Sequence, residues 1–152
     1  VIYITIYIIM NLGFFSCLLM MKRNNVYYEQ IDDLSGLSKN HPMLSLSLLI
    51  ILFSLAGIPP LAGFFAKFYI FKSVIEQSMY FLAIVGLLAT VVAAFYYLRI
   101  IKIMYFDKEK ESYDKDNSLW LKFSLSFSTL IILLYFIFPS QLVDAVSKIN
   151  II

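Results

Sequence analysis

The residues best suited to chemistry are a lysine and a group of prolines and glycines in one apolar stretch, LSLSLLIILFSLAGIPPLAGFFAKFYIF. Gly57, Pro59, Pro60 and Gly63 fall within seven residues, and Lys67 follows four residues later. Proline lacks the N–H of a helical hydrogen bond and its ring clashes with the preceding turn, while glycine adds backbone freedom. The four residues are therefore predicted to break a helix near its middle.

A helix break inside a membrane restricts what can surround it. The freed backbone groups have no partners in lipid, so the break is tolerated only where protein or water covers it. Discontinuous helices of this kind recur in ion-coupled transporters. The segment is therefore expected to face a bundle interior or a wet cavity, although a plain proline kink that only shapes packing is an alternative.

Lys67 is predicted to act as a proton relay. It lies about eight residues from the end of its apolar stretch, which is ~12 Å along a helix. A lysine at the centre of a transmembrane helix costs roughly 2.5–3.5 kcal/mol on insertion scales and is usually functional. The alternative is a lysine that snorkels to the interface, a description that suits Lys72 well. None of the helical neighbours of Lys67 three and four residues away can pair with it: Gly63, Phe64, Ile70 and Phe71.

The elements that must position these residues are membrane helices. The 152-residue chain is 61% apolar and 14% charged, whereas soluble domains are roughly 45–50% apolar and about 25% charged. A helix needs about 20 mostly apolar residues to cross the hydrocarbon core. Four stretches qualify, and none alternates like a barrel strand. The prediction is an all-α polytopic transmembrane bundle whose second span is broken at a Pro-Pro loop, with spans at about 1–21, 43–75, 79–98 and 123–143.

The connections between the spans carry the charges. Residues 22–42 and 99–122 are predicted to be solvated and contain nine of the basic residues, against two on the opposite side. Positive charge marks the cytoplasmic or matrix side, so both termini are expected to face the other way. Tyr96 and Tyr97 suit an interfacial aromatic belt. The expected location is a bacterial inner membrane or a mitochondrial inner membrane.

Several other functions are not favoured. The basic residues form no stripe, so nucleic acid is not an expected partner. Cys17 is the only cysteine and His41 the only histidine, and neither has the spacing of a metal site. The chain opens in apolar sequence at Val1 without the basic start of a signal peptide. It is therefore interpreted as the downstream piece of a longer protein or as one product of a split gene.

The string LSGLSKNHPMLSLSLLIILFSLAGIPPLAGFFAKFYIF, with YIIMNLGFF upstream and FYYLRIIKIMYF downstream, resembles subunit N (mitochondrial subunit 2) of proton-pumping NADH:quinone oxidoreductase, respiratory complex I. The resemblance covers essentially the whole chain and assigns it to the C-terminal four of fourteen helices. It implies that Lys67, in GFFAKF, belongs to the proton path of the broken twelfth helix. The family's other key charges, on its fifth, seventh and eighth helices, lie upstream of Val1.

The resemblance implies a translocase subunit that couples NADH-to-quinone electron transfer to proton pumping. Electron transfer would take place in other subunits, so no cofactor, flavin, iron–sulfur cluster or metal is expected in this chain. The implied partners are the lipid bilayer, the other membrane subunits of complex I and the upstream part of the same subunit. Two alternatives stay open: a subunit of a related multi-subunit cation/proton antiporter, and a purely structural fragment of the membrane arm.

Overall fold

The computed structural model describes residues 2–23, 26–27, 30–110, 113–114 and 118–137. Within these residues the chain is helical apart from one two-residue antiparallel β-ladder. The elements in chain order are α1 (Ile2–Met20), β1 (Lys22–Arg23), β2 (Val26–Tyr27), the 3-10 helix η1 (Ile31–Leu34), α2 (Leu37–Asn40), α3 (Pro42–Ala56), α4 (Ala62–Glu76), α5 (Tyr80–Phe106) and α6 (Leu119–Ile137). The predicted all-helical architecture is confirmed.

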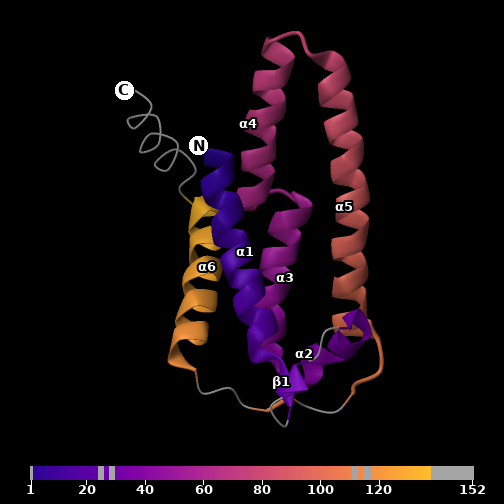
Figure 1. Ribbon diagram of the computed structural model, residues 1–152, viewed down its shortest axis with the longest axis vertical. Coiled ribbons are helices and arrows are strands. Elements are labelled where there is room, and N and C mark those ends of the chain that lie inside the picture. Colours follow the sequence, from indigo (N-terminus) through magenta and orange to yellow (C-terminus); the bar gives the residue numbers. More distant parts are fainter. Residues whose placement is uncertain (1, 24–25, 28–29, 111–112, 115–117, 138–152) are drawn as a thin grey trace.

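The helices form one bundle with a projecting hairpin (Figure 1). Helices α1, α3 and α6 contact one another, and α5 packs against α3 from another side. Helix α4 continues beyond the end of α3. It forms a hairpin with α5, and this hairpin projects beyond the end of α3 (Figure 1). The connections that join α1 to α3 and α5 to α6 meet at the opposite end. The bundle therefore has a broken helix, α3 and α4, at its centre.

Among the described residues, two helices are long and apolar enough to cross a membrane, Tyr3–Met20 and Tyr80–Phe106. Helices α3 and α4 have 15 residues each, which corresponds to about 22 Å. The hydrocarbon core is about 30 Å thick, so neither crosses it alone. The apolar part of α6 that the structure describes, Leu119–Tyr135, is also shorter than the two helices named above. Residues 138–143 of the fourth predicted span lie outside the described residues.

Helices extend into both ends of the predicted connection 99–122. Helix α5 continues eight residues past Leu98 to Phe106, and α6 begins at Leu119. The added part of α5 is helical because Ile101, Ile103 and Met104 are buried against the bundle. Lys102 points outward on the same stretch. Charged residues here lie on the exposed face of a helix, and they do not mark its end.

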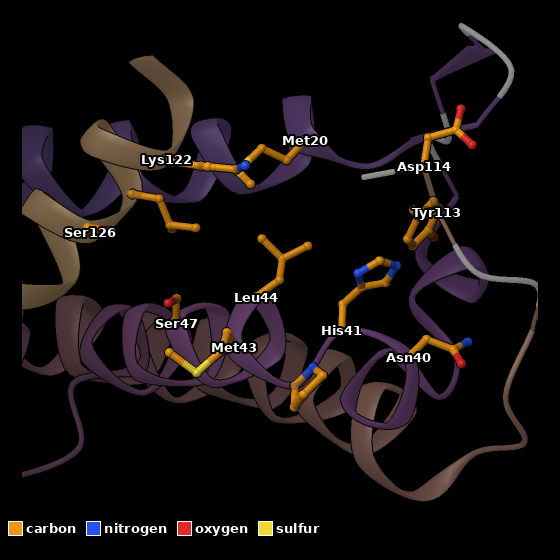
Figure 2. Close-up of a pocket in the computed structure, with 12 residues that line it drawn as sticks. Met20, Asn40, His41, Met43, Leu44, Ser47, Tyr113, Asp114, Lys122 and Ser126 are labelled. Carbon is orange, nitrogen blue, oxygen red and sulfur yellow. The ribbon is translucent and has the colours of Figure 1, made fainter. Parts of the chain in front are cut away.

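The two connections at this end of the bundle are tied together by hydrogen bonds. Asn40 Nδ2 donates to Lys110 O at 2.8 Å, and the Tyr113 hydroxyl donates to Asp33 O. The rings of His41 and Tyr113 lie beside each other with centroids 6.0 Å apart (Figure 2). His41 therefore has a structural place at the start of α3, in agreement with its interpretation from sequence.

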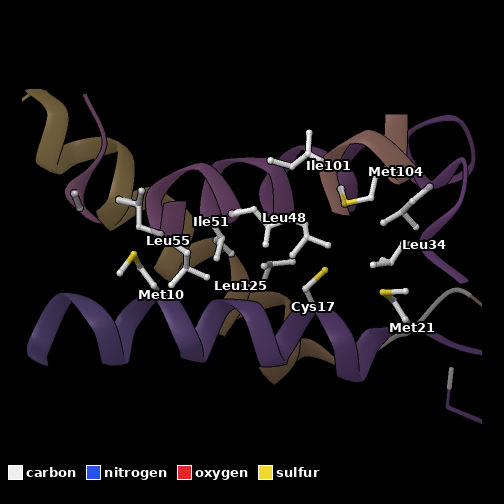
Figure 3. Packing of buried hydrophobic residues seen from close by; sticks show 14 of the residues in the cluster. Met10, Cys17, Met21, Leu34, Leu48, Ile51, Leu55, Ile101, Met104 and Leu125 are labelled. Atoms are coloured by element: carbon white, nitrogen blue, oxygen red, sulfur yellow. The ribbon is translucent and has the colours of Figure 1, made fainter. Parts of the chain in front are cut away.

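The apolar core lies between α1, α3, α4, α5 and α6 and runs along the bundle, from Met21 and Met104 near these connections to Met10 and Leu55 near the helix break (Figure 3). Cys17 and Leu48 are fully buried there, and Cys17 acts as a small apolar side chain. Much of α5 faces outward with large apolar groups, such as Phe81 at 83% exposure. A helix that is apolar all round requires lipid or other helices around it. The surface of α5 is therefore suited to a membrane.

Candidate functional site at the helix break

The end of α3 is closed by a glycine in the left-handed conformation. Gly57 has φ +84°, where residues with a side chain are strained. Its N–H donates to Ser54 O at 3.0 Å, and the N–H of Ile58 donates to Phe53 O at 3.0 Å. This is the bond pair of a Schellman cap. It satisfies two of the four carbonyls that a helix leaves without intrahelical partners at its C-terminus.

The other two carbonyls at the end of α3 are bound by Lys67. Its Nζ donates to Leu55 O at 2.9 Å and to Ala56 O at 3.3 Å. Among the described residues, no carboxylate forms an ion pair with Lys67. A helix C-terminus carries a partial negative charge of about half an electron, which favours a cation there. The break in the helix therefore supplies the electrostatic partner of the lysine from backbone atoms.

Two glycines allow the halves of the broken helix to approach each other. A Cβ on Gly57 would lie 3.2 Å from Lys67 Cδ and 3.3 Å from its Nζ. A Cβ on Gly63 would lie 1.8 Å from Ser54 O, and the Gly63 N–H donates to Ser54 Oγ at 3.0 Å. Ser54 Oγ in turn donates to Met10 Sδ at 3.0 Å. These contacts hold the start of α4 close to the end of α3, and Ser54 connects both to α1.

The non-helical segment runs from Gly57 to Leu61. Pro59 and Pro60 lie in it and are exposed, and the N–H of Leu61 donates to Ile58 O at 3.2 Å across them. Gly63, predicted as part of the break, is instead the second residue of α4. Helix α4 can begin at Ala62 because both prolines precede it, and Gly63 serves the close contact with α3.

A cavity of about 200 Å³ lies beside Lys67, between α1, α4 and α5. Lys67 and Gly63 form its α4 wall, and Leu55 contributes from α3. Tyr3 and Tyr7 line it from α1, with rings stacked at 5.8 Å between centroids. The α5 wall contains Ala89, Thr90, Ala93 and Tyr97. An ammonium group and several hydroxyl-bearing side chains therefore line one partly open cavity, which is an arrangement that can bind water and pass protons.

Tyr97 is the residue whose sequence interpretation changes most. It was expected in an interfacial aromatic belt with Tyr96, but it lines the cavity of Lys67, while Tyr96 is 54% exposed. The spacing of Thr90, Ala93 and Tyr97 places all three on one face of a helix. That spacing could have identified the face, but nothing in it indicates that Lys67 lies opposite.

Lys72 lies outside this site. It forms an i,i+4 pair with Glu76 at 3.8 Å, and both side chains are more than half exposed. The position agrees with the interpretation of Lys72 as a lysine that reaches the interface. Groups of three or more His, Cys, Asp or Glu side chains that could hold a metal ion do not occur among the described residues.

Known proteins match the chain over most of its length. The family described as NADH:quinone oxidoreductase/Mrp antiporter, TM matches residues 1–93. NADH-quinone oxidoreductase subunit N of Pelagibacter ubique is 80% identical over the whole chain, which spans 32% of that protein. Subunit N of Parvibaculum lavamentivorans is 49% identical over 95% of the chain and 30% of its own length. The chain therefore spans about a third of the length of these curated relatives.

A solved structure matches the fold. Respiratory complex I from Thermus thermophilus with bound aureothin contains a chain that aligns with a TM-score of 0.77. The alignment covers 91% of this chain and 31% of that one, at 24% sequence identity. The similarity shows that the helices are arranged as in part of a chain of that complex.

Proposed function

This chain belongs to the NADH:quinone oxidoreductase/Mrp antiporter transmembrane family, and we propose that it forms the C-terminal part of a proton-translocating membrane-arm subunit of NADH:quinone oxidoreductase. In that subunit Lys67 binds and releases the transported proton. The observation that carries the proposal is the position of its ammonium group. It is held by two backbone carbonyls at a helix break, at the edge of a cavity of about 200 Å³.

The arrangement suits a group that must let a proton go. The partial charge of a helix end holds a cation less strongly than a full carboxylate would. A second positive charge that enters the cavity then repels the ammonium and favours release of its proton. A water molecule occupies about 30 Å³ in the liquid, so the cavity has room for several. These waters and the hydroxyls of Tyr3, Tyr7 and Tyr97 would carry the proton onward.

Four membrane crossings follow if α3 and α4 act as one. Each half is about 22 Å long, and together with the segment 57–61 they exceed the hydrocarbon thickness of about 30 Å. The second span is then α3 and α4 in sequence, and Lys67 lies within the membrane. Helices α1, α5 and α6 form the first, third and fourth spans. The named relatives are bacterial, so the membrane is the bacterial inner membrane.

The chain carries one relay residue, and the rest of the path belongs to its partners. Because it spans about a third of its relatives, the upstream part of the same subunit is proposed to supply the other relay charges. Neighbouring membrane subunits complete the arm. Electron transfer from NADH to quinone takes place in other subunits, and this chain itself binds no redox cofactor.

Native electrophoresis of host membranes with an NADH dehydrogenase activity stain tests this assignment. Peptides of this chain, identified by mass spectrometry, are expected in the active band. The proposal is overturned if the peptides occur only in a band without that activity and the same membranes exchange cations for protons in the absence of NADH. That result would assign the chain to an antiporter. The description of the family covers both kinds of protein, so this experiment separates them directly.

A further inference from the structure

A second cavity lies at the end of the bundle where the connections meet. Its volume is about 450 Å³, and it shares no lining residue with the cavity of Lys67. Its walls are the end of α1, the first turns of α3 and α6, and the segment that contains Tyr113 and Asp114 (Figure 2). Met20, Leu44 and Leu125 make part of the lining apolar. A volume of this size is typical of sites for small molecules.

One side of this cavity presents hydrogen-bond donors without protein partners. The side chains of Ser47, Lys122 and Ser126 form no hydrogen bond or ion pair within the part of the chain that the structure describes. Lys122 and Ser126 are one turn apart on α6, so they share a face, and Ser47 lies on the facing helix α3 (Figure 2). Lys122 and Ser126 are exposed and Ser47 is half-buried, so the donors lie at the open side of the cavity. A lysine and two hydroxyls on the lining of one cavity are groups that can donate to phosphate oxygens.

The start of α3 adds to the same electrostatic pattern. Pro42 occupies its first turn, and the N-cap residue His41 makes no side-chain hydrogen bond to the helix. The first-turn residues Met43 and Leu44 line the cavity. The partial positive charge of an uncapped helix N-terminus favours an anion in front of it. Lys122 and the α3 terminus therefore attract negative charge to one place.

The cavity lies at the level of the membrane surface. Trp120 is 83% exposed in the first turn of α6, two residues before Lys122. Tryptophan concentrates at the membrane–water interface, and α1 ends at Met20 on the wall of the same cavity. This end of the bundle also carries most of the basic residues, so it faces the leaflet where anionic headgroups attract cations. Lipid headgroups place phosphate groups at this level of a membrane.

We propose that this cavity binds the headgroup of a membrane phospholipid. Lys122, Ser126 and Ser47 hold the phosphodiester, and the glycerol and upper acyl carbons pack on Met20 and Leu125. The site is separate from the proton path and does not depend on Lys67.

The test uses the complete complex that contains this chain, extracted in mild detergent and washed free of bulk lipid. Phospholipid that remains bound is counted per complex by mass spectrometry, and its affinity is measured by titrating phosphatidylglycerol in mixed micelles. Lys122→Ala is expected to weaken binding about tenfold or more, since it removes a charged hydrogen-bond donor. Lys122→Arg keeps the charge and retains the lipid. Lys102→Ala removes an exposed lysine outside the cavity at the same end and leaves binding unchanged.

Three results would overturn the proposal. Equal lipid retention in Lys122→Ala and Lys102→Ala would show that Lys122 holds no headgroup. Displacement of the lipid by inorganic phosphate alone would identify a soluble anion as the ligand. Protein density in the cavity in a map of the complex would identify a protein partner.

Should Lys122→Ala fail to assemble, the double variant Ser47→Ala/Ser126→Ala is measured, with the same loss expected. Lys67→Met is expected to retain the lipid, which separates this site from the proposed relay.

Discussion

Alanine in place of Gly57 tests whether the position of Lys67 depends on the shape of the α3 cap. An alanine at φ +84° costs roughly 1–2 kcal/mol because of contact between its Cβ and the backbone. The new Cβ would also lie 3.2 Å from Lys67 Cδ and 3.3 Å from its Nζ. The end of the Lys67 side chain therefore has to shift by a few tenths of an ångström, which disturbs its bonds to the carbonyls of Leu55 and Ala56.

The expected cost of this change follows from the hydrogen bonds that it endangers. A hydrogen bond to a charged group contributes about 1.5–3 kcal/mol. The backbone strain alone gives about 1–2 kcal/mol, and complete loss of one of the two Lys67 bonds would raise the total to about 2.5–5 kcal/mol. Gly57→Ala should therefore lower the amount of assembled complex, and the complex that does assemble should translocate fewer protons per NADH. Both quantities are measured in inverted membrane vesicles, by immunoblot and by acidification coupled to NADH oxidation.

Gly57→Asn separates crowding from strain. Asparagine tolerates the left-handed region better than alanine, but it carries the same Cβ beside Lys67. If the contact with Lys67 matters, both variants lose protons per NADH. A normal ratio in Gly57→Asn with a reduced ratio in Gly57→Ala would mean that backbone strain alone is responsible. A normal ratio in both, at normal amounts of complex, would refute the reasoning.

Three further changes probe the surroundings of the site. Gly63→Ala places a Cβ 1.8 Å from Ser54 O, so little complex should assemble on native gels; a normal amount would contradict the close contact of α3 with α4. Ser54→Ala leaves the Gly63 N–H without an acceptor at a cost of about 1–3 kcal/mol, which should lower the thermal stability of the complex more than Ser73→Ala on the exposed side of α4 does. Tyr97→Phe removes a hydroxyl from the cavity of Lys67 and should lower proton translocation, whereas Tyr96→Phe on the exposed side should not; equal effects would remove Tyr97 from the path.

Local sequence chemistry predicted the break itself well. Proline and glycine act on their own backbone, so Gly57, Pro59 and Pro60 identify the interruption without knowledge of any neighbour. The partner of Lys67 could not be predicted in this way. Its ammonium binds carbonyls of residues 11 and 12 positions earlier, and that contact exists only because the chain folds back at the break.

Helix ends were predicted less well than helix centres. The prediction ended the third span at Leu98 because charges follow it, yet α5 runs to Phe106. Charged side chains can lie on the outer face of a helix whose inner face is packed, as Lys102 does beside Ile101 and Ile103. Sequence alone does not show which face is covered, and for the same reason the wall position of Tyr97 was missed.

The central claim, that Lys67 carries the transported proton, is tested most directly by the number of protons translocated per NADH oxidised. Lys67→Met keeps an unbranched side chain without a charge, and Lys72→Met is the matched control because Lys72 forms only an exposed pair with Glu76. Both variants are compared with the parent protein in inverted vesicles at equal rates of NADH oxidation. A lower ratio in Lys67→Met with a normal ratio in Lys72→Met is the predicted result. An unchanged ratio in Lys67→Met would show that the proton takes another route.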